Sequence, residues 1–312
     1  KKMVAYGEFR TSYEKDKDDQ RIVYYGIRYI LENYINIKWT IEDVELSNAF
    51  FQTHNIGYTK FPFPKDLFIK FIKENDGYFP IKLQSLPEGS IIYPHVPVYQ
   101  IIAENEYSRL VTYLETILTM VWYPSTVATL SRRSKTIIQN AFNKSVDEDS
   151  NHLLLSRLHD FGFRGCTCIE QSIIGGCAHL LNFDGTDTLT AAYYAQYKLN
   201  NSKPVATSIP ATEHSIMTSY RTEREAIIKL LENYGSNVCA CVMDSYDYIN
   251  ALDNILPSIA KYKLEKGGFL ILRPDSGNQI DVVIQGLQAC EKVFGYTLNK
   301  KGYKVINGAG II

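Results

Sequence analysis

The sequence predicts an α/β fold in which a β/α barrel follows a mixed N-terminal lobe. From residue 152 onward, short apolar or β-branched runs recur roughly every 25 to 35 residues, and most end in a polar cluster. Most gaps between these runs carry apolar residues at helical spacing. Alternating strands and helices indicate a parallel sheet. Polar clusters at the carboxyl ends of successive strands favour a barrel with its active site at that end.

The first 148 residues are expected to form an α+β lobe, and residues 149–312 the barrel. Apolar residues at helical spacing predict four helices in the lobe, over residues 21–35, 66–75, 106–124 and 131–142. Pro124 is expected to end the third helix. The segment 87–104, PEGSIIYPHVPVYQIIAE, predicts short strands, and the polar segment 144–151 is expected to link the two parts.

In the barrel, six runs are expected to be strands: 158–165, 179–187, 205–214, 238–247, 268–277 and 304–310. Helices are expected over 222–235 and 280–295. A closed barrel of this type has about eight strands, so we expect it to be incomplete in this chain and the native protein to be longer at one or both ends.

Composition and charge exclude several classes of protein. The 312 residues are 45% apolar and 21% charged with a net charge of −1, which is typical of a globular protein and gives no basic surface for general nucleic-acid binding. No apolar run reaches the roughly 18 residues that a membrane-spanning helix needs. The N-terminus lacks the apolar core of a signal peptide. We therefore expect a cytoplasmic protein without nucleic-acid or membrane partners.

The six cysteines are expected to be small buried residues. Two pairs have C-x-C spacing, Cys166/Cys168 and Cys239/Cys241, which in a strand places both thiols on one face. A zinc site needs about four converging ligands, and no further His or Cys lies nearby at a usual spacing. The sequence therefore predicts no zinc site at these cysteines.

Each polar cluster has a structural interpretation beside a functional one. Asp187, Asp244 and Asp247 are each placed to cap a following helix. His159, Asp160 and Phe161 could form a turn with one packed aromatic ring, and Arg273 and Asp275 a local ion pair. Caps do not explain arginines at two strand ends, or a histidine beside a glutamate.

Taken together, these residues suit an anionic substrate and a developing positive charge. Arg164 and Arg273 can hold phosphate or pyrophosphate. Asp244 and Asp275 can bind Mg²⁺ or ribose hydroxyls, or stabilise an oxocarbenium-like centre. Phe161 offers a flat face to a ring. If the predicted strands are neighbours, all of these side chains share one mouth of the barrel.

The segment 208–215, SIPATEHS, contains the histidine beside a glutamate. It could be a solvated loop tip. It could also hold a nucleophile or base, His214, with Glu213 or Asp244 as the carboxylate that orients it.

Five motifs in this order, LHDFGFRG, NFDGTDT, IPATEHS, DSYD and RPDSGN, resemble those of the nicotinamide phosphoribosyltransferase family. The N-terminal segments AYGEFR, VYYGIRYIL, LPEGSII and ETILTMVWYPSTVAT resemble that family too, so the resemblance covers nearly the whole chain. It implies a type II phosphoribosyltransferase, a homodimer with shared active sites, built from an α+β lobe and an irregular β/α barrel. The implied reaction joins nicotinamide to phosphoribosyl pyrophosphate. It gives nicotinamide mononucleotide and pyrophosphate in NAD salvage, with Mg²⁺ as cofactor and ATP as co-substrate.

The resemblance also implies roles for residues of the motifs. Phe161 would stack on the nicotinamide ring, and Arg164 would lie at its carboxamide and the phosphate. Asp187 would accept the amide NH₂ and repel the carboxylate of nicotinic acid. His214 would be a phosphorylated histidine that couples ATP hydrolysis to the reaction, positioned by Glu213 and Asp244.

Further residues receive substrate-binding roles from the same resemblance. Ser208, Arg273 and Asp275 would line the nicotinamide and ribose site. Gly308 would form a glycine turn at that site, with Ala309 in the place of a family aspartate that contacts ribose. Arg10 would reach the phosphates bound by the neighbouring subunit.

Other functions remain open at this point. A nicotinate phosphoribosyltransferase has a related fold and reaction, and Asp187 argues against it. A non-catalytic relative could act as a binding protein, although the motif residues are intact. An unrelated barrel hydrolase with a metal is disfavoured, because the chain has no His-x-His or H-E-x-x-H spacing.

Overall fold

The chain forms two compact units in the computed structural model, which describes residues 1–12 and 18–312. The first unit holds residues 1–138 and 155–206, and the second holds 139–154 and 207–312. These units differ from the predicted division at residue 148, because the segment 155–206 groups with the N-terminal part. As a statement about the domains of the full-length protein, that division stays a prediction.

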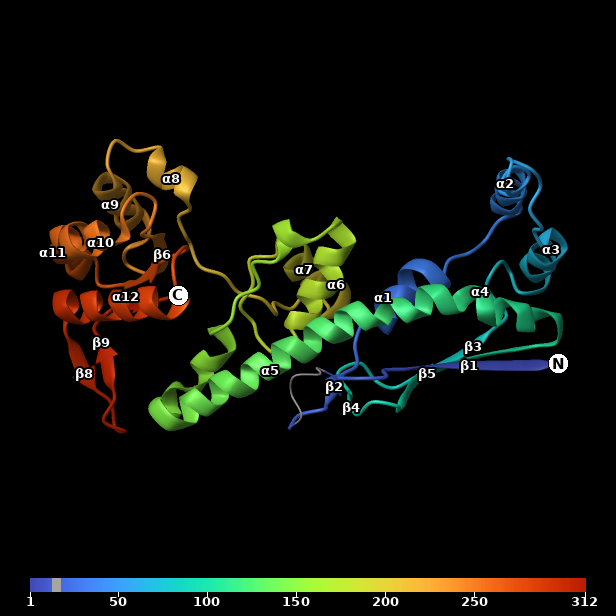
Figure 1. Cartoon of the computed structure of the whole chain (residues 1–312), viewed down its shortest axis with the longest axis horizontal. Helices are drawn as coiled ribbons and strands as arrows, with labels where there is room; N and C mark the ends of the chain where they lie inside the picture. The colour runs from blue at the N-terminus through green and yellow to red at the C-terminus, as the bar shows by residue number, and fades with distance from the viewer. Residues whose placement is uncertain (13–17) are drawn as a thin grey trace. The chain divides into compact units, whose positions relative to one another are not determined.

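The first unit is a mixture of antiparallel strands and helices (Figure 1). Its strands are β1 (Lys2–Glu8), β2 (Ile22–Val23), β3 (Lys82–Ser85), β4 (Ile91–Ile92) and β5 (Pro97–Glu104). Its helices are α1 (Ile27–Ile30), α2 (Ile41–Phe51), α3 (Lys65–Glu74), α4 (Arg109–Leu118), most of α5 (Trp122–Ser145), α6 (Ile169–His179) and α7 (Leu189–Tyr194). Strands β1, β5 and β3 pair antiparallel in that order, while β2 pairs with β4.

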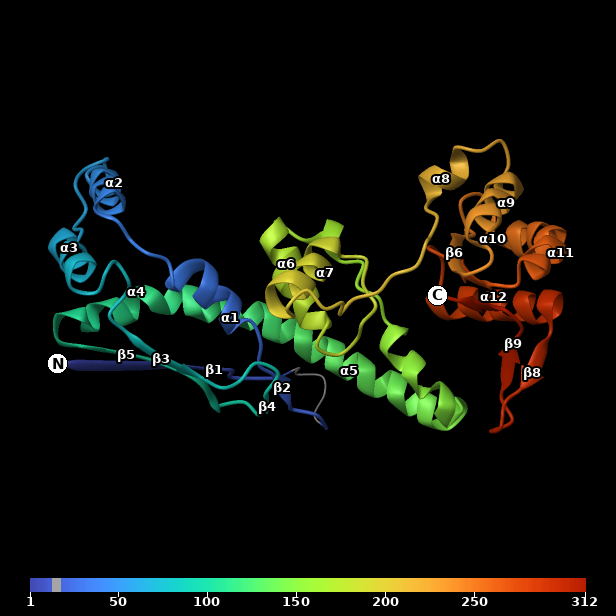
Figure 2. The same cartoon turned by 180° about the vertical axis from the view of Figure 1, so that it is seen from behind.

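The core of the first unit forms where helix α4 packs along the sheet of β1, β5 and β3, as Figure 2 shows from behind. Leu110 and Leu114 on the apolar face of α4 and Ile101 of β5 are buried in the same core cluster. This packing explains why apolar residues recur at helical spacing in 106–118 and in alternation along β5. The predicted α+β character of this part of the chain is therefore confirmed.

Two predictions about the first unit need correction. Pro124 does not end a helix. It lies in the first turn of α5, where the missing N–H removes no hydrogen bond, after a 3₁₀ turn at Thr119–Val121. The run 21–35 is not helical throughout either, because it begins as strand β2. Gly26 divides the two parts: its φ is +107°, and a Cβ there would lie 2.3 Å from Pro124.

Side chains of helix α5 hold this strand segment in place. The Thr129 hydroxyl accepts a hydrogen bond from Val23 N at 3.0 Å and donates to Ser125 O. The Ser125 hydroxyl accepts from Tyr25 N and donates to Tyr25 O, both at 3.0 Å. Both hydroxyls are buried, so they replace the strand partner that this short strand lacks on that side.

The second unit is built around a parallel three-stranded sheet. Its strands are β6 (Val238–Val242), β7 (Phe269–Arg273), β8 (Tyr296–Leu298), β9 (Lys304–Ile306) and β10 (Ala309–Ile311). Its helices are α8 (His214–Thr218), α9 (Glu223–Tyr234), α10 (Tyr248–Asn250), α11 (Leu256–Lys266) and α12 (Gln279–Phe294). The parallel order is β10-β7-β6, and β8 and β9 form a separate antiparallel hairpin.

The chain is thus a mixed α/β protein, and the described residues contain no closed barrel. Of the six predicted barrel strands, three contribute to the parallel sheet: 238–247 as β6, 268–277 as β7 and 304–310 as β10. The third run contributes only its last residues, because β10 begins at Ala309. The runs 158–165 and 179–187 meet in one parallel bridge, between Asp160 and Thr186, and 205–214 reaches β6 through one bridge at Ala211. Glycines in the first two runs and Pro210 in the third weaken or interrupt a strand ladder. The described residues also contain no helix long and apolar enough to cross a membrane.

The cysteines divide according to this sheet. Cys239 and Cys241 are buried in β6, as predicted. Cys166 is half-buried and Cys168 is exposed. The prediction was wrong for this second pair because the run 158–165 leads into a 3₁₀ turn and not a strand. Among the described residues, no group of three or more His, Cys, Asp or Glu side chains could hold a metal ion.

A Thr129→Val substitution keeps the side-chain volume and removes the hydroxyl that accepts from Val23 N. We expect the free energy of unfolding to fall by about 1–3 kcal/mol, because a buried N–H loses its partner. Urea unfolding followed by circular dichroism measures this. The matched control is Thr136→Val, which lies in the same helix, is exposed and donates to Arg132 O; we expect a change within about 0.5 kcal/mol. Equal effects of both variants would show that the hydroxyl does not anchor β2.

Candidate active site

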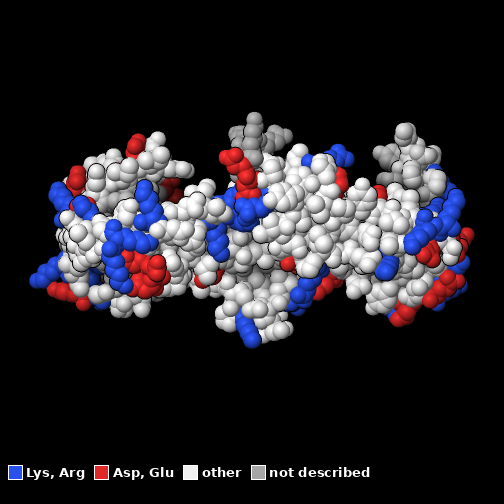
Figure 3. Space-filling model, turned by 90° about the horizontal axis from the view of Figure 1, so that it is seen from below, with Lys and Arg blue, Asp and Glu red and all other residues white. Residues whose placement is uncertain are grey.

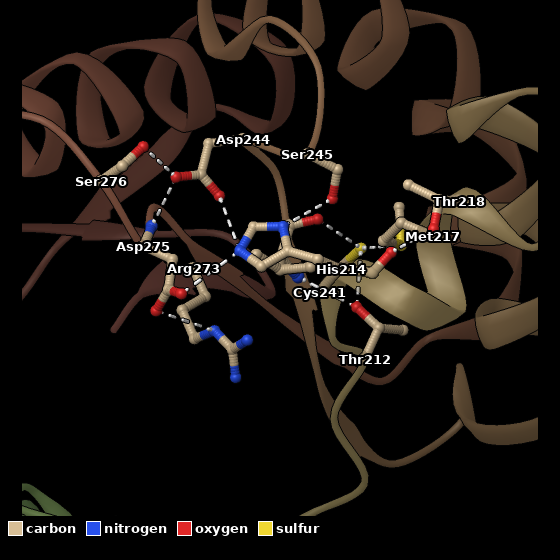
Figure 4. Close-up of polar contacts among 11 residues, drawn as sticks. Thr212, His214, Met217, Thr218, Cys241, Asp244, Ser245, Arg273, Asp275 and Ser276 are labelled. Atoms are coloured by element: carbon tan, nitrogen blue, oxygen red, sulfur yellow. Dashed lines mark hydrogen bonds and ion pairs between the residues drawn. The ribbon is translucent and has the colours of Figure 1, made fainter.

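His214 stands at the centre of a polar cluster in the second unit (Figure 4). Its Nδ1 lies 3.1 Å from the Ser245 hydroxyl, and its Nε2 lies 3.2 Å from Asp275 Oδ2 and 4.0 Å from Asp244 Oδ1. Asp244 is nearly buried, with 5% of its side chain exposed, whereas His214 and Asp275 are about half exposed, at 47% and 53%. The Nε2 side of the imidazole therefore faces the nearly buried Asp244 and the half-exposed Asp275, and the ring is accessible to a ligand.

The partners of His214 fix its tautomer in the neutral state. Carboxylate oxygens of Asp275 and Asp244 can only accept, so Nε2 carries the proton. Nδ1 then has the lone pair, which accepts from the Ser245 hydroxyl. A histidine with a carboxylate on one nitrogen and a lone pair on the other has the arrangement of an activated nucleophile or general base.

The parallel sheet explains why these residues meet. Val242 at the end of β6 pairs with Arg273 at the end of β7, so the residues that follow both strands lie at the same edge. Asp244 Oδ2 accepts hydrogen bonds from Asp275 N at 3.0 Å and from the Ser276 hydroxyl at 2.5 Å. One carboxylate oxygen thus fixes the loop after β7, and the other faces His214.

The chain reaches His214 along the outer side of β6. Thr212 N donates to Ala240 O, and the Thr212 hydroxyl accepts from Val242 N at 3.0 Å. Two residues later, helix α8 begins at His214 with Glu213 as its N-cap residue. The predicted placement of the glutamate-histidine pair after an extended segment is confirmed, and one bridge, at Ala211, joins this segment to β6.

Glu213 and Arg273 lie at the edges of the His214 cluster. Among the described residues, the Glu213 carboxylate accepts from the Ser215 hydroxyl and not from His214. Arg273 Nε lies 3.9 Å from Asp275 Oδ1 and, within the described chain, is buried without a hydrogen-bond partner. Asp244 rather than Glu213 is therefore the carboxylate that faces His214, and the predicted Arg273–Asp275 ion pair is present.

One member of this neighbourhood was not anticipated. Glu223 is the first residue of α9 and only 5% exposed, and its Oε1 has no hydrogen-bond partner in the described part of the chain. Burial raises the pKa of Glu223 to about 7, and the nearby charges of Asp244 and Asp247 add to the rise. Asp247 itself caps α10 by accepting from Asn250 N, as the structural interpretation predicted.

The first unit holds the other group of predicted residues. His159 Nδ1 lies 3.3 Å from Asp187 Oδ2, and the Phe161 ring meets the His159 ring edge-on with centroids 6.3 Å apart. A Cβ on Gly185 would come within 2.6 Å of the His159 ring, so the glycine of NFDGTDT makes room for this histidine. The N-cap position of α7 is occupied by Thr188, the residue after Asp187.

Beside this group lies a pocket of about 440 Å³. Its wall includes His159, Asp160 and Phe161 together with residues of α5 and α6. The Phe161 side chain is 52% exposed, so its ring presents an open face. A pocket with an aromatic ring and a histidine–aspartate pair nearby can hold a planar, polar ring.

A buried histidine that the sequence did not single out fixes the two loops that form this group. His179 Nε2 lies 3.0 Å from Leu158 O and 3.1 Å from Gly185 O, and Nδ1 lies 3.0 Å from the Ser131 hydroxyl. Burial lowers the pKa of His179, so the neutral ring donates from Nε2 and accepts at Nδ1. Its position at the end of an apolar helix was the available signal.

The remaining predicted residues fall in several places. Arg164 is exposed in the 3₁₀ turn Phe163–Gly165. Arg10 is exposed on the wall of a second pocket, of about 400 Å³, in the first unit. Ser208 lies exposed in the segment before α8. The structure brings the second-unit residues together around His214 and the first-unit residues around His159; that both groups share one mouth stays a prediction.

Gly308 lies away from the His214 cluster within the second unit. Leu270 N donates to Gly308 O, and Ala309 pairs with Leu270 near the start of β7. Because β10 and β7 are parallel, Gly308 and Ala309 lie at the amino end of the sheet, opposite the edge that carries Asp244 and Asp275. Gly308 forms the turn between β9 and β10, with φ +59°, and its role in substrate binding stays a prediction.

Charges of both signs lie close together on the face of the molecule that Figure 3 displays. Surface ion pairs of the second unit include Lys300–Asp149 and Lys304–Glu291, at 2.8 and 2.5 Å. Exposed pairs of this kind are worth little in stability. The cluster around His214 differs from them because its central acid is buried.

Comparisons with known proteins agree with the motifs. The model of the nicotinate phosphoribosyltransferase (NAPRTase) family matches residues 156–310. The chain is 35% identical over 296 residues to a nicotinamide phosphoribosyltransferase of Xanthomonas campestris pv. campestris. The aligned region covers 93% of this chain and 62% of that protein. It is 31% identical over 255 residues to the nicotinamide phosphoribosyltransferase of Acinetobacter baylyi, with 74% and 50% covered.

A solved structure has a similar fold. The crystal structure of human nicotinic acid phosphoribosyltransferase superposes with a TM-score of 0.62 at 19% identity and covers 94% of this chain and 60% of that one. This chain thus spans about half to three fifths of the length of the curated relatives that it matches.

Glu223→Gln replaces the buried acid by a neutral side chain of the same shape. The folded-state pKa of about 7 lies above the usual 4.5, so the contribution of Glu223 to stability is complete below pH 4.5 and is lost as the pH rises towards 7. We expect the unfolding free energy of the wild type, relative to the variant, to fall by about 2–3 kcal/mol across that window. Urea unfolding at several pH values measures it. Glu225→Gln, on the same turn and half-exposed, is the control, and parallel curves for Glu223→Gln and wild type would contradict the expectation.

Proposed function

The chain belongs to the nicotinate phosphoribosyltransferase family, and within it we propose that the full-length protein is a nicotinamide phosphoribosyltransferase. The proposed reaction joins nicotinamide to phosphoribosyl pyrophosphate and gives nicotinamide mononucleotide and pyrophosphate, a step of NAD salvage. The observation that carries the proposal is His214, with a lone pair on one nitrogen and two carboxylates on the other. The names of the relatives that match most of the chain support it.

In the proposed function, the first unit recognises the base. The open face of Phe161 stacks on the pyridine ring, and Arg164, exposed in the next turn, binds the carboxamide and the phosphate. Asp187 is oriented by His159 at 3.3 Å and accepts the amide NH₂. The same carboxylate would repel the carboxylate of nicotinic acid, so the choice of substrate depends on both attraction and repulsion.

The second unit carries the phosphate chemistry. His214 Nδ1 uses its lone pair to attack the γ-phosphorus of ATP; the bond to the bridging oxygen breaks, and ADP leaves with that electron pair. Asp275 and Asp244 retain the Nε2 proton and stabilise the positive charge that develops on the ring. Arg273 and Asp275, at the same strand end, are proposed to line the ribose site. Hydrolysis of the phosphohistidine then drives formation of the mononucleotide.

Magnesium enters this proposal with the substrates. The described residues form no cage of three or more acidic or histidine ligands. Mg²⁺ usually keeps several waters and binds phosphate oxygens together with few protein groups. We therefore propose that it arrives on phosphoribosyl pyrophosphate and ATP, where it neutralises phosphate charge.

The assembly of the full-length protein belongs to the same proposal. The parallel strands β10, β7 and β6 would be this chain's contribution to an irregular β/α barrel. The enzyme would be a cytoplasmic homodimer, in which Arg10 reaches phosphates bound by the neighbouring subunit. Arg10 is exposed on the wall of a pocket in the first unit, which leaves it accessible for such a contact.

Nicotinate phosphoribosyltransferase is the second candidate, favoured by the description of the matching family and by the human structure. The two candidates differ in one group of the substrate, an amide or a carboxylate. Asp187 favours the first candidate, because an acid beside the ring substituent disfavours an anionic substrate.

Full-length protein with phosphoribosyl pyrophosphate, Mg²⁺, ATP and equal amounts of nicotinamide and nicotinic acid should form nicotinamide mononucleotide in large excess. Asp187→Asn removes the charge and keeps the shape, so we expect the preference to fall by roughly 10-fold or more. Liquid chromatography of both mononucleotides measures the ratio. Asp184→Asn, three residues away in the same loop, is the control and should keep the wild-type preference.

Product from nicotinic acid alone would replace the proposal by the second candidate. No product from either base, in folded protein, would leave a binding protein. An unchanged preference in Asp187→Asn would remove the specificity role from Asp187 while leaving the reaction intact.

A further inference from the structure

Glu223 is a buried acid for which neither the sequence motifs nor the proposed mechanism has a role. An acid in the first turn of a helix is usually solvent-exposed, where the helix dipole favours its charge. Glu223 occupies that position in α9, but it is 5% exposed and its Oε1 is without a partner in the described chain. Burying a charged carboxylate in this way is costly, so the position requires an explanation.

The surroundings of Glu223 are those of the His214 cluster. Three elements pack against α9: α8, β6 and α11. Helix α8 begins with His214, and β6 contains Cys241 and continues into Asp244 and Asp247. Helix α11 meets α9 where Arg224 Nε donates to the Ser258 hydroxyl at 3.1 Å.

The charges that act on Glu223 are mainly negative. Asp244 and Asp247 both disfavour its ionised form, and Glu223 in turn helps to raise the pKa of the buried Cys241 thiol to about 12, mainly an effect of burial. Asp244 has its own unpaired buried oxygen, Oδ1, which faces His214 at 4.0 Å. Glu223 and Asp244 are thus two nearly buried acids within electrostatic reach of one another, and the cheaper state has one charge and not two.

We propose that Glu223 is a positioning residue that acts through Asp244: it holds a proton, limits the negative charge next to His214, and so lets the cluster accept a phosphate-bearing substrate. This inference rests on the proposed function for the identity of that substrate. Asp244 Oδ1 faces Nε2 of His214 at 4.0 Å, whereas a charge at Glu223 would repel an incoming phosphate. When Glu223 loses its proton to water, the site gains one negative charge and binds phosphate more weakly.

The test compares full-length wild type with Glu223→Gln, Glu223→Asp and Glu225→Gln. The KM for phosphoribosyl pyrophosphate is measured near pH 6 and pH 8 at saturating nicotinamide. In the wild type, KM should rise between pH 6 and pH 8, because Glu223 gains a negative charge. Glu223→Gln cannot gain this charge, so we expect the ratio of KM at pH 8 to KM at pH 6 to be roughly three- to tenfold larger in the wild type than in the variant. Glu223→Asp keeps a titrating acid and should keep the pH dependence. Glu225→Gln should resemble the wild type.

A second readout does not need activity. Nuclear magnetic resonance follows the His214 imidazole, assigned by its absence in His214→Ala, as the pH is raised. In the wild type the resonance should respond to the ionisation of Glu223, whose pKa is raised to about 7. This response should be lost in Glu223→Gln and kept in Glu225→Gln.

The outcomes separate this inference from the proposed function. An active wild type whose KM ratio is the same in Glu223→Gln overturns the role of Glu223 alone. A wild type that forms no mononucleotide overturns the proposed function, and the imidazole titration then still tests the charge coupling. If Glu223→Gln does not fold, infrared spectra of the wild type decide: a buried protonated carboxyl band that is present near pH 6 and lost near pH 8 supports the inference, and its absence contradicts it.

Discussion

Parallel pairing of β6 with β7 is the constraint on which the His214 cluster depends. Because Val242 and Arg273 are paired at the ends of these strands, the loops that follow them start side by side. Asp244 then completes the arrangement with one carboxylate: Oδ2 holds Asp275 N and the Ser276 hydroxyl, and Oδ1 faces the imidazole. A change in strand register would move every one of these groups.

The buried acids give this cluster its chemical character. Asp244 has little access to water, so its charge acts on His214 with little screening. Glu223 is also buried, and the structure supplies no cation that would pair with it in the described residues. The proton on Glu223 is the simplest way to keep this part of the unit stable. A site that must bind phosphate near neutral pH benefits from the same proton.

Local sequence pattern was sufficient where one helix face or one strand decides the structure. Helices α3, α9 and α12 lie within a residue of the predicted ranges, because their apolar spacing survives in the packed unit. It was not sufficient where tertiary contacts decide. Strand β2 is held by hydroxyls of Ser125 and Thr129, about 100 residues away, and no local pattern indicates that.

The candidate site likewise combines features that the sequence motifs indicate with features that depend on tertiary contacts. The motifs identified His214, Asp244, Asp275 and Asp187, since their residue types and order carry chemistry. They did not show where Gly308 lies, because a glycine turn looks the same at either end of a strand and only the pairing of Ala309 with Leu270 reveals which end it is. Glu223 was missed because TEREAII is indistinguishable from a helix start with acids in water; its burial depends on β6 and α8.

The most direct measurement of the central claim is the location of phosphate on the protein. Full-length protein is incubated with γ-labelled ATP and Mg²⁺, and its peptides are analysed by mass spectrometry under conditions that preserve phosphohistidine. The account predicts one acid-labile phosphate, on His214, that disappears in His214→Ala while the Asp275→Asn variant accumulates less of it. Label on another residue, or no label in a protein that makes mononucleotide with ATP stimulation, would contradict the assignment of His214 as the phosphoryl acceptor.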